Sequence, residues 1–160
     1  MAEAAGLVKG EGKLIVSACL AGEACRYDGK ANLVSGIKEL VLSGHAVAVC
    51  PECLGGLDIP REPCEIRVVK GVKKVYNVQK DDCTAAFEKG AVRALAIAHK
   101  NNVTGAVLKA KSPSCGCGRV YDGHFNGTLV DGDGITTALF KENGIIVITE
   151  IEWINQNQEE

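Results

Sequence analysis

Cysteines are the residues of this 160-residue chain best suited to carry chemistry, and six of the eight form three close pairs. The pairs are Cys19 with Cys25, Cys50 with Cys53, and Cys115 with Cys117. Cysteine thiolates bind zinc, iron and iron–sulfur clusters, and they are the nucleophiles of dithiol redox enzymes. We therefore expect these pairs to build a metal or redox site.

The first cysteine of each pair follows a run that is predicted to be a buried β-strand. The runs are short, apolar and rich in β-branched residues, which is typical of parallel strands covered on both faces. They span residues 14–18, 46–49 and 105–109. Ligands of open parallel sheets bind beyond the carboxyl ends of the strands. The sequence therefore predicts that Cys19, Cys50 and Cys115 lie at one end of such a sheet.

Helical and turn patterns fill the intervals between these strands. Helices are predicted over residues 33–42, 82–100 and 133–141, and a last strand over 145–148. Asp81 or Asp82, and Asp133, are the expected helix caps. Residues 51–65 are predicted to form a long loop. Residues 66–78 are predicted to form a small hairpin or an extended excursion, and residues 119–129 a short hairpin or a glycine-rich loop.

This alternation predicts an α/β fold with right-handed parallel crossovers. We expect one domain over residues 13–150: a three-layer Rossmann-like or flavodoxin-like sheet of about four to five mainly parallel strands with a small β excursion. Residues 1–12 and 154–160 are expected to be flexible termini. No G-x-G-x-x-G follows the first strand, which disfavours dinucleotide binding.

Composition excludes several partner classes. The net charge is −2 and only 4% of residues are aromatic, so neither a basic surface nor stacking platforms for a nucleic acid polymer are expected. The sequence has no run of about 20 apolar residues that could cross a membrane. It also begins without a secretory pattern, which favours a reducing cytoplasm, where cysteine clusters bind metal or catalyse.

Two alternatives to an open metal site follow from the residues alone. Four cysteines could form a closed zinc or iron–sulfur site, which would make the chain a structural or electron-transfer module. Cys50 and Cys53 form C-x-x-C, a pattern of dithiol oxidoreductases. Cys64 and Cys83 stand alone and are expected to be inert, buried thiols.

Five sequence motifs together resemble one known family, and the resemblance runs from about residue 13 to residue 149. They are VSACL at 16–20 with CRYDGK at 25–30, VCPE at 49–52 with LGGL at 54–57, KAKSPSCG at 109–116, YDG at 121–123, and GDG at 132–134. In this order and spacing they resemble the domain of unknown function 523 family, which includes the bacterial 2-thiouracil desulfidases.

The resemblance implies a [4Fe-4S] cluster held by only three cysteines, with one iron open. The implied ligands are Cys19, Cys50 and Cys115. Cys25, Cys53 and Cys117 are secondary candidates, and a fourth ligand among them would close the cluster. An open metal position is what distinguishes a catalytic site from a structural one.

The implied activity is non-redox hydrolysis of a thiocarbonyl compound such as 2-thiouracil, with release of hydrogen sulfide. Glu52 and Ser112 are the expected catalytic residues, since a carboxylate can move protons to and from the attacking water and a hydroxyl can orient water or substrate. Substrate binding is assigned to four further motif residues, namely Ser17, Tyr27, Asp28 and Ser114. The expected partner is a small thiolated molecule, and a homodimer is compatible with the sequence.

Overall fold

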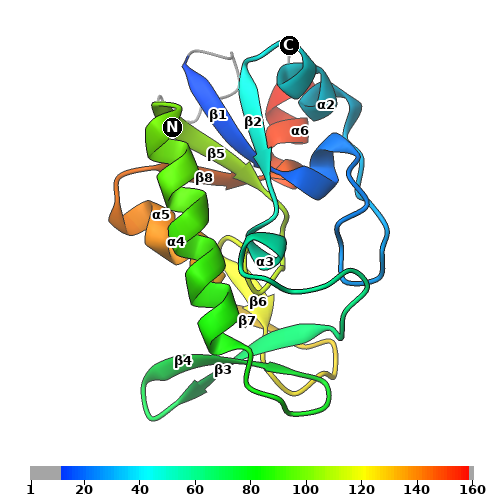
Figure 1. Ribbon diagram of the computed structural model, residues 1–160, viewed down its shortest axis with the longest axis vertical. Helices are drawn as coiled ribbons and strands as arrows, with labels where there is room; N and C mark the ends of the chain where they lie inside the picture. The colour runs from blue at the N-terminus through cyan, green and yellow to red at the C-terminus, as the bar shows by residue number, and fades with distance from the viewer. Residues whose placement is uncertain (1–11, 159–160) are drawn as a thin grey trace.

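A parallel β-sheet of four strands, covered by helices on both faces, forms the centre of the protein (Figure 1). The computed structural model describes residues 12–158. The strand order is β2-β1-β5-β8, and all three pairings are parallel. The strands are β1 (Lys13–Ser17), β2 (Ala46–Val49), β5 (Val103–Leu108) and β8 (Ile146–Thr149). The predicted three-layer α/β fold is confirmed.

The covering helices are α2 (Ser35–Leu42), α4 (Thr84–Lys100), α5 (Ile135–Glu142) and α6 (Glu150–Gln158). Alternate residues of β1 face the two layers, as the strand period of two requires. Ile15 packs in the core shared with α4 and α5, whereas Leu14 and Val16 pack in the core shared with α2 and α6. β1 is thus buried on both faces, which explains its continuous apolar sequence.

Two small antiparallel hairpins lie beyond the end of the sheet to which β1 and β2 point (Figure 1). They are formed by β3 (Cys64–Val69) with β4 (Val72–Asn77), and by β6 (Arg119–Tyr121) with β7 (Leu129–Asp131). Both match the hairpins expected over residues 66–78 and 119–129. They place two loops beside the carboxyl ends of the strands, where the cysteines lie.

Two helices lie where none was expected. Residues of the predicted long loop form the short helix α3 (Pro51–Leu54), and α6 continues to Gln158 although the chain was expected to fray after Trp153. A capping box explains the second difference, because Thr149 Oγ1 accepts the Glu152 N–H and Glu152 Oε1 accepts the Thr149 N–H, both at 3.2 Å. Residues 1–11 and 159–160 lie outside the described residues.

Neither predicted cap residue occupies the N-cap position of its helix. The N-cap of α4 is Cys83, which makes no side-chain cap bond, and Asp82 Oδ1 accepts the N–H of Thr84, the first residue of α4, at 2.9 Å. Asp133 does not cap α5, which also begins without a side-chain cap. Its Oδ1 instead accepts the Gly118 N–H at 2.8 Å, and it forms an ion pair with Lys141 at 3.1 Å. Among the described helices, none is long and apolar enough to cross a membrane.

Candidate active site

The three predicted ligand cysteines follow three neighbouring strands at the same end of the sheet. Cys19 lies in the 3-10 turn η1 (Ala18–Ala21) directly after β1, Cys50 lies between β2 and α3, and Cys115 lies in the loop after β5. The strand order reverses at β1, which lies between β2 and β5. The site is therefore at the topological switch point, the usual ligand position of this architecture.

The thiols of these cysteines are free, and they lie within electrostatic reach of one another. Burial raises the pKa of Cys19, and a charge on Cys50 raises it further. Burial also raises the pKa of Cys115 to about 12, with a further contribution from Cys19. Since a metal ligand must be a thiolate, loading this site requires the release of protons.

Hydrogen-bond donors point at the sulfur atoms of the buried pair. Asn32 Nδ2 donates to Cys19 Sγ at 3.6 Å, and Ser114 Oγ lies 3.6 Å from Cys115 Sγ. Ser17 Oγ accepts the Lys109 N–H at 2.9 Å, so its own proton is free to donate to Cys115, whose pKa it lowers against the larger effect of burial. Donors of this kind stabilise thiolate ligands and set the potential of iron–sulfur clusters.

Cys50 is the thiol of this site most ready to ionise. The neighbouring Cys25 thiol, with a smaller contribution from the backbone and thiol of Cys53, lowers the pKa of Cys50 to about 6. The neighbouring Cys50 raises the pKa of Cys25, and burial raises the pKa of Cys53 to about 11. When protonated, the Cys50 thiol itself donates to the Cys25 carbonyl oxygen at 3.8 Å.

The chemistry of the donor set is that of an iron–sulfur site, because thiolates are the usual ligands of such clusters. All eight cysteines lie within residues 12–158 and are free thiols. In this range no three His, Cys, Asp or Glu side chains converge on one metal position. In a [4Fe-4S] cluster each cysteine binds a different iron, so its protein ligands need not meet at one ion.

Two glycines fix the position of α3, the short helix that carries Glu52. A Cβ atom at Gly55 would overlap the carbonyl oxygen of Ala86, and one at Gly90 would overlap the carbonyl oxygen of Pro51. The backbones of α3 and α4 therefore lie in direct contact, which only glycine permits. The long, rigid α4 in this way holds both Cys50 and Glu52 in place.

The loop that carries Cys115 is held by the start of α5. The N–H groups of Ile135 and Thr136 bond to the carbonyl oxygens of Pro113 and Ser114, both at 2.9 Å. Thr137 Oγ1 donates to the Cys115 carbonyl oxygen at 2.8 Å. A Cβ atom at Gly134 would lie 2.5 Å from the backbone of Ser114, so this contact also requires glycine.

Both carboxylate oxygens of Glu52, the predicted catalytic residue, accept hydrogen bonds. Arg61 Nε donates to Glu52 Oε1 at 3.0 Å, and Ser114 Oγ donates to Glu52 Oε2 at 3.0 Å. The side chains of Glu52 and Arg61 are only 14% and 8% exposed. Arg61 also donates to the carbonyl oxygens of Cys25 and Asp58, at 3.0 and 3.1 Å.

The hydroxyl of Ser112 extends this network. Ser112 Oγ accepts the N–H groups of Ser114 at 3.1 Å and Cys115 at 3.0 Å, and it lies 3.0 Å from Ser114 Oγ. Because both lone pairs of Ser112 are occupied, its proton is the one that joins the two hydroxyls. The order of donation is therefore Ser112 to Ser114 to Glu52.

A cavity of about 540 Å³ opens over these groups and is lined by both Glu52 and Ser112. Tyr27, predicted to bind substrate, also lines it. Basic and aromatic side chains line it as well, namely Arg26, Arg61, Lys109, Lys111, Tyr121 and Phe125, together with Cys64 and a second carboxylate, Glu65. Lys109 Nζ is paired with Glu150 at 3.2 Å. The cavity combines positive charge, ring faces and a carboxylate, which suits a small polar ring.

Three predicted substrate-binding residues lie away from the cavity wall. Ser17 and Ser114 are 3% and 2% exposed and hydrogen-bond toward Cys115. Asp28 accepts the Lys30 N–H at 3.0 Å and forms an ion pair with Arg26 at 3.0 Å.

Cys117, a secondary ligand candidate, donates its thiol proton to the Val147 carbonyl oxygen at 3.6 Å.

Sequence reasoning missed Arg61, Asn32 and Phe125. A single arginine between Pro60 and Pro63, in the loop after the cysteine motif, was a usable signal for Arg61. Asn32 and Phe125 carried no such signal, since their roles depend on contacts between distant segments.

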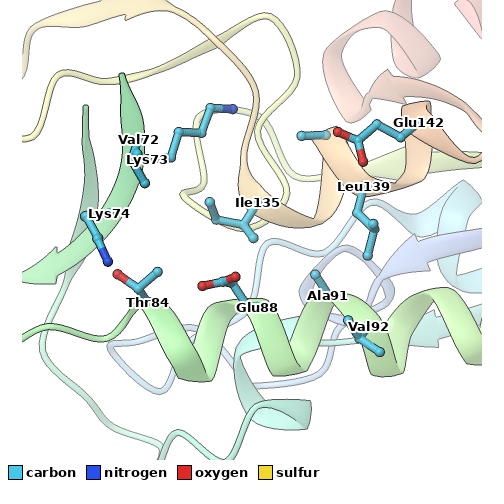
Figure 2. Close-up of a pocket in the computed structure, with 11 residues that line it drawn as sticks. Val72, Lys73, Lys74, Thr84, Glu88, Ala91, Val92, Ile135, Leu139 and Glu142 are labelled. Carbon is cyan, nitrogen blue, oxygen red and sulfur yellow. The ribbon is translucent and has the colours of Figure 1, made fainter. Parts of the chain in front are cut away.

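A second hollow, of about 340 Å³, lies between α4, α5 and β4 (Figure 2). Figure 2 shows Ile135 and Leu139 on α5 facing Glu88 and Ala91 on α4, with Lys74 on the neighbouring strand. None of the residues that line it is a cysteine, serine or histidine. It offers no counterpart to the network of Glu52, Arg61 and Ser112 at the first cavity.

Comparison with known proteins agrees with this geometry. Residues 14–152 match the 2-thiouracil desulfurase family. The uncharacterized protein YbbK of Bacillus subtilis (strain 168) is 41% identical over 145 residues, which cover 87% of this chain and 96% of YbbK. The solved structure of the [4Fe-4S]-dependent thiouracil desulfidase TudS is 40% identical, with a TM-score of 0.82 over 93% of this chain and 97% of TudS. The chain belongs to the 2-thiouracil desulfurase family.

Proposed function

We propose that this protein is a desulfidase that hydrolyses the C=S bond of a small thiocarbonyl compound such as 2-thiouracil. The balanced reaction is C=S plus water giving C=O plus hydrogen sulfide, with no net electron transfer. The observation that carries the proposal is the junction of Glu52 with Ser114, because it joins a cavity-lining carboxylate to the loop of Cys115 at 3.0 Å.

Cys19, Cys50 and Cys115 are the proposed ligands of a [4Fe-4S] cluster. When bound, a cluster with three protein ligands supplies one open iron that polarises the thiocarbonyl and accepts its sulfur. The free thiols and the donors around their sulfur atoms support this assignment. TudS, the solved relative, is described as [4Fe-4S]-dependent.

Glu52 is the proposed general base. Its carboxylate lines the cavity and takes a proton from the water that adds to the thiocarbonyl carbon. Arg61 holds Oε1 of Glu52, so the carboxylate keeps one orientation through the reaction. Such fixed geometry avoids reorganisation as charge develops.

Ser112 and Ser114 are proposed to hold the Glu52 carboxylate in position for this proton transfer. Ser112 Oγ, whose two lone pairs accept backbone N–H groups, donates to Ser114 Oγ, and Ser114 Oγ donates to Glu52 Oε2. Protonated Glu52 returns its proton to the leaving sulfur, which takes its second proton from the added hydroxyl and departs as hydrogen sulfide. The two hydroxyls thereby orient the base from the loop of Cys115.

A dithiol oxidoreductase is the second candidate, and the lowered pKa of Cys50 beside Cys53 is what favours it. The main cause of that shift is the Cys25 thiol, which a two-cysteine redox motif does not need. In addition, a dithiol oxidoreductase has no need of the hydrogen bonds by which Arg61 and Ser114 orient Glu52.

Anaerobic purification and cluster reconstitution, followed by addition of 2-thiouracil, test the proposal. We expect about four irons per chain, a broad absorption near 400 nm typical of iron–sulfur proteins, and release of sulfide. Glu52→Gln should keep the iron and lose roughly 100-fold or more in kcat. Cys83→Ser, outside both the proposed ligand set and the cavity, is the matched control for Cys19→Ser, Cys50→Ser and Cys115→Ser, which should lose iron.

A further inference from the structure

Aromatic side chains gather at the proposed active-site cavity. The chain has one Trp, three Tyr and three Phe, and three of these seven residues line this one cavity. They are Tyr27, Tyr121 and Phe125. In a chain so poor in aromatic residues, this concentration indicates a ligand with a flat face.

Of the three aromatic residues, Phe125 is the one whose backbone conformation is most constrained. Its backbone has φ of +55°, in the left-handed region that side chains other than glycine and asparagine rarely adopt. It lies in the β6–β7 loop between two exposed residues, His124 and Asn126, yet its own side chain is only partly exposed. Phenylalanine has no polar group, so its ring is all that it offers the cavity.

Glu65 on β3 holds Phe125 in this conformation. Glu65 Oε1 accepts the N–H groups of both Gly123 and Phe125, at 3.0 and 3.1 Å. Arg67 Nη2 on the same strand donates to the Gly123 carbonyl oxygen at 3.2 Å. A Cβ atom at Gly123 would lie 2.7 Å from the Ile66 carbonyl oxygen, so the loop and the strand are in close contact.

Holding a non-glycine residue in a left-handed conformation costs free energy, and it persists only when surrounding contacts enforce it. Here a cavity-lining carboxylate on one hairpin fixes a cavity-lining ring on the other. The result is a ring fixed at the cavity wall, where stacking on a planar ligand loses little side-chain freedom.

We propose that Phe125, positioned by Glu65, is the specificity determinant of this site and that it stacks on the ring of the substrate. Stacking on Phe125 would favour the planar ring of 2-thiouracil over an acyclic thioamide, which offers no ring face. This inference rests on the proposed function for its reaction, but ring binding can be measured without turnover.

The kinetic test compares 2-thiouracil with thioacetamide in Phe125→Leu, which keeps an apolar side chain and removes the ring. Loss of one ring–base stack should raise KM for 2-thiouracil roughly 5- to 100-fold. Stacking binds ground state and transition state alike, so kcat should stay within about threefold. Thioacetamide turnover should not change, which makes it the internal control. Equal effects on both substrates, or no effect, would overturn the proposal.

Glu65→Ala and Glu65→Gln test the positioning role with an unaltered ring. Glutamine retains an Oε1 that accepts two N–H groups, whereas alanine removes it. Glu65→Ala should raise KM for 2-thiouracil as Phe125→Leu does, and Glu65→Gln should restore most of the binding. Indistinguishable values for the two Glu65 variants would contradict the role of Glu65. These variants also keep the proposal testable if Phe125→Leu does not fold.

Calorimetric titration with uracil separates the two proposals. Wild-type protein that binds uracil more tightly than Phe125→Leu supports the ring-stacking inference even if no sulfide is released, in which case only the proposed function fails. Equal uracil binding by the two proteins overturns the inference whatever the turnover. Wild-type protein that neither binds uracil nor releases sulfide from any thioamide overturns both.

Discussion

Arg61 Nε lies 3.0 Å from Glu52 Oε1, and this ion pair is almost completely shielded from solvent. Arg61 also donates to the carbonyl oxygens of Cys25 and Asp58, and its N–H bonds to the Tyr27 carbonyl oxygen at 2.8 Å. One side chain thus joins the loop after β1 to the helix after β2. The orientation of the carboxylate depends on a residue that is not itself expected to touch the reacting atoms.

Replacement of Arg61 should reduce catalysis through Glu52. In Arg61→Met the carboxylate keeps only its bond to Ser114 and loses its fixed orientation, so kcat should fall roughly 100-fold. Arg61→Lys restores the charge but not the planar fork, and we expect partial recovery. Steady-state sulfide release with 2-thiouracil is the measurement.

A double-mutant cycle separates this role from general damage. If Arg61 acts through Glu52, then Arg61→Met should add little to Glu52→Gln, because the two residues work as a unit. Additive losses in kcat would show that Arg61 acts elsewhere in the fold.

The hydroxyl network predicts that Ser114 matters although it is buried. Ser114→Ala breaks the chain of hydrogen bonds between Ser112 and Glu52, so kcat should fall by roughly 100-fold, similar to Ser112→Ala. Ser43→Ala, an exposed serine bonded to His45, is the matched control and should behave as wild type. Kinetics of Ser114→Ala equal to those of the control, at unchanged iron content, would rule out the role of the hydroxyls in orienting Glu52.

Gly90 offers a test of how α3 is positioned. In an isolated helix a Gly→Ala change stabilises by about 1 kcal/mol. In α4 the added methyl group meets the Pro51 carbonyl oxygen, and overpacking of this kind costs about 1–3 kcal/mol. Thermal unfolding of Gly90→Ala should therefore show a lower Tm, together with weaker iron retention. A raised Tm would contradict the direct contact of the two helices, and Ala96→Ser on the exposed side of α4 serves as the control.

Metal-free protein should be alkylated first at Cys50. With a pKa lowered to about 6, this thiol is mostly ionised at pH 7, whereas Cys53, raised to about 11, is protonated. The alkylation rate should rise with pH through about 6. Cys25→Ala removes the thiol that contributes most to lowering the pKa of Cys50, so the midpoint of the alkylation rate should move to higher pH. Peptide mass spectrometry after timed iodoacetamide treatment at pH 5 to 9 gives the rates, and faster labelling of Cys53 would contradict the assignment.

Much of the fold could be predicted because its signals are local. The β-branched runs of β1, β2 and β5 and the 3.6-residue period of α4 each identify an element without its neighbours. The shared position of Cys19, Cys50 and Cys115 then follows from the rule that parallel strands present their carboxyl ends at one edge.

The remainder depends on contacts between segments far apart in the sequence. α3 is held by Gly90, 35 or more positions along the chain, and a four-residue helix has too weak a period to be predicted. Aspartate is a residue type that often caps helices, but the carboxylate of Asp133 accepts the Gly118 N–H instead. Phe125 enters the cavity only because Glu65 of the other hairpin fixes its loop.

Hydrolysis in ¹⁸O-labelled water tests the central claim most directly. Cluster-loaded protein is supplied with 2-thiouracil under anaerobic conditions, and sulfide and uracil are quantified, the latter by mass spectrometry. The account predicts one sulfide per uracil, one ¹⁸O atom in the uracil carbonyl at C2, and no need for an added reductant or oxidant. Intact cluster with unchanged 2-thiouracil, or sulfide release that requires electrons, would contradict it.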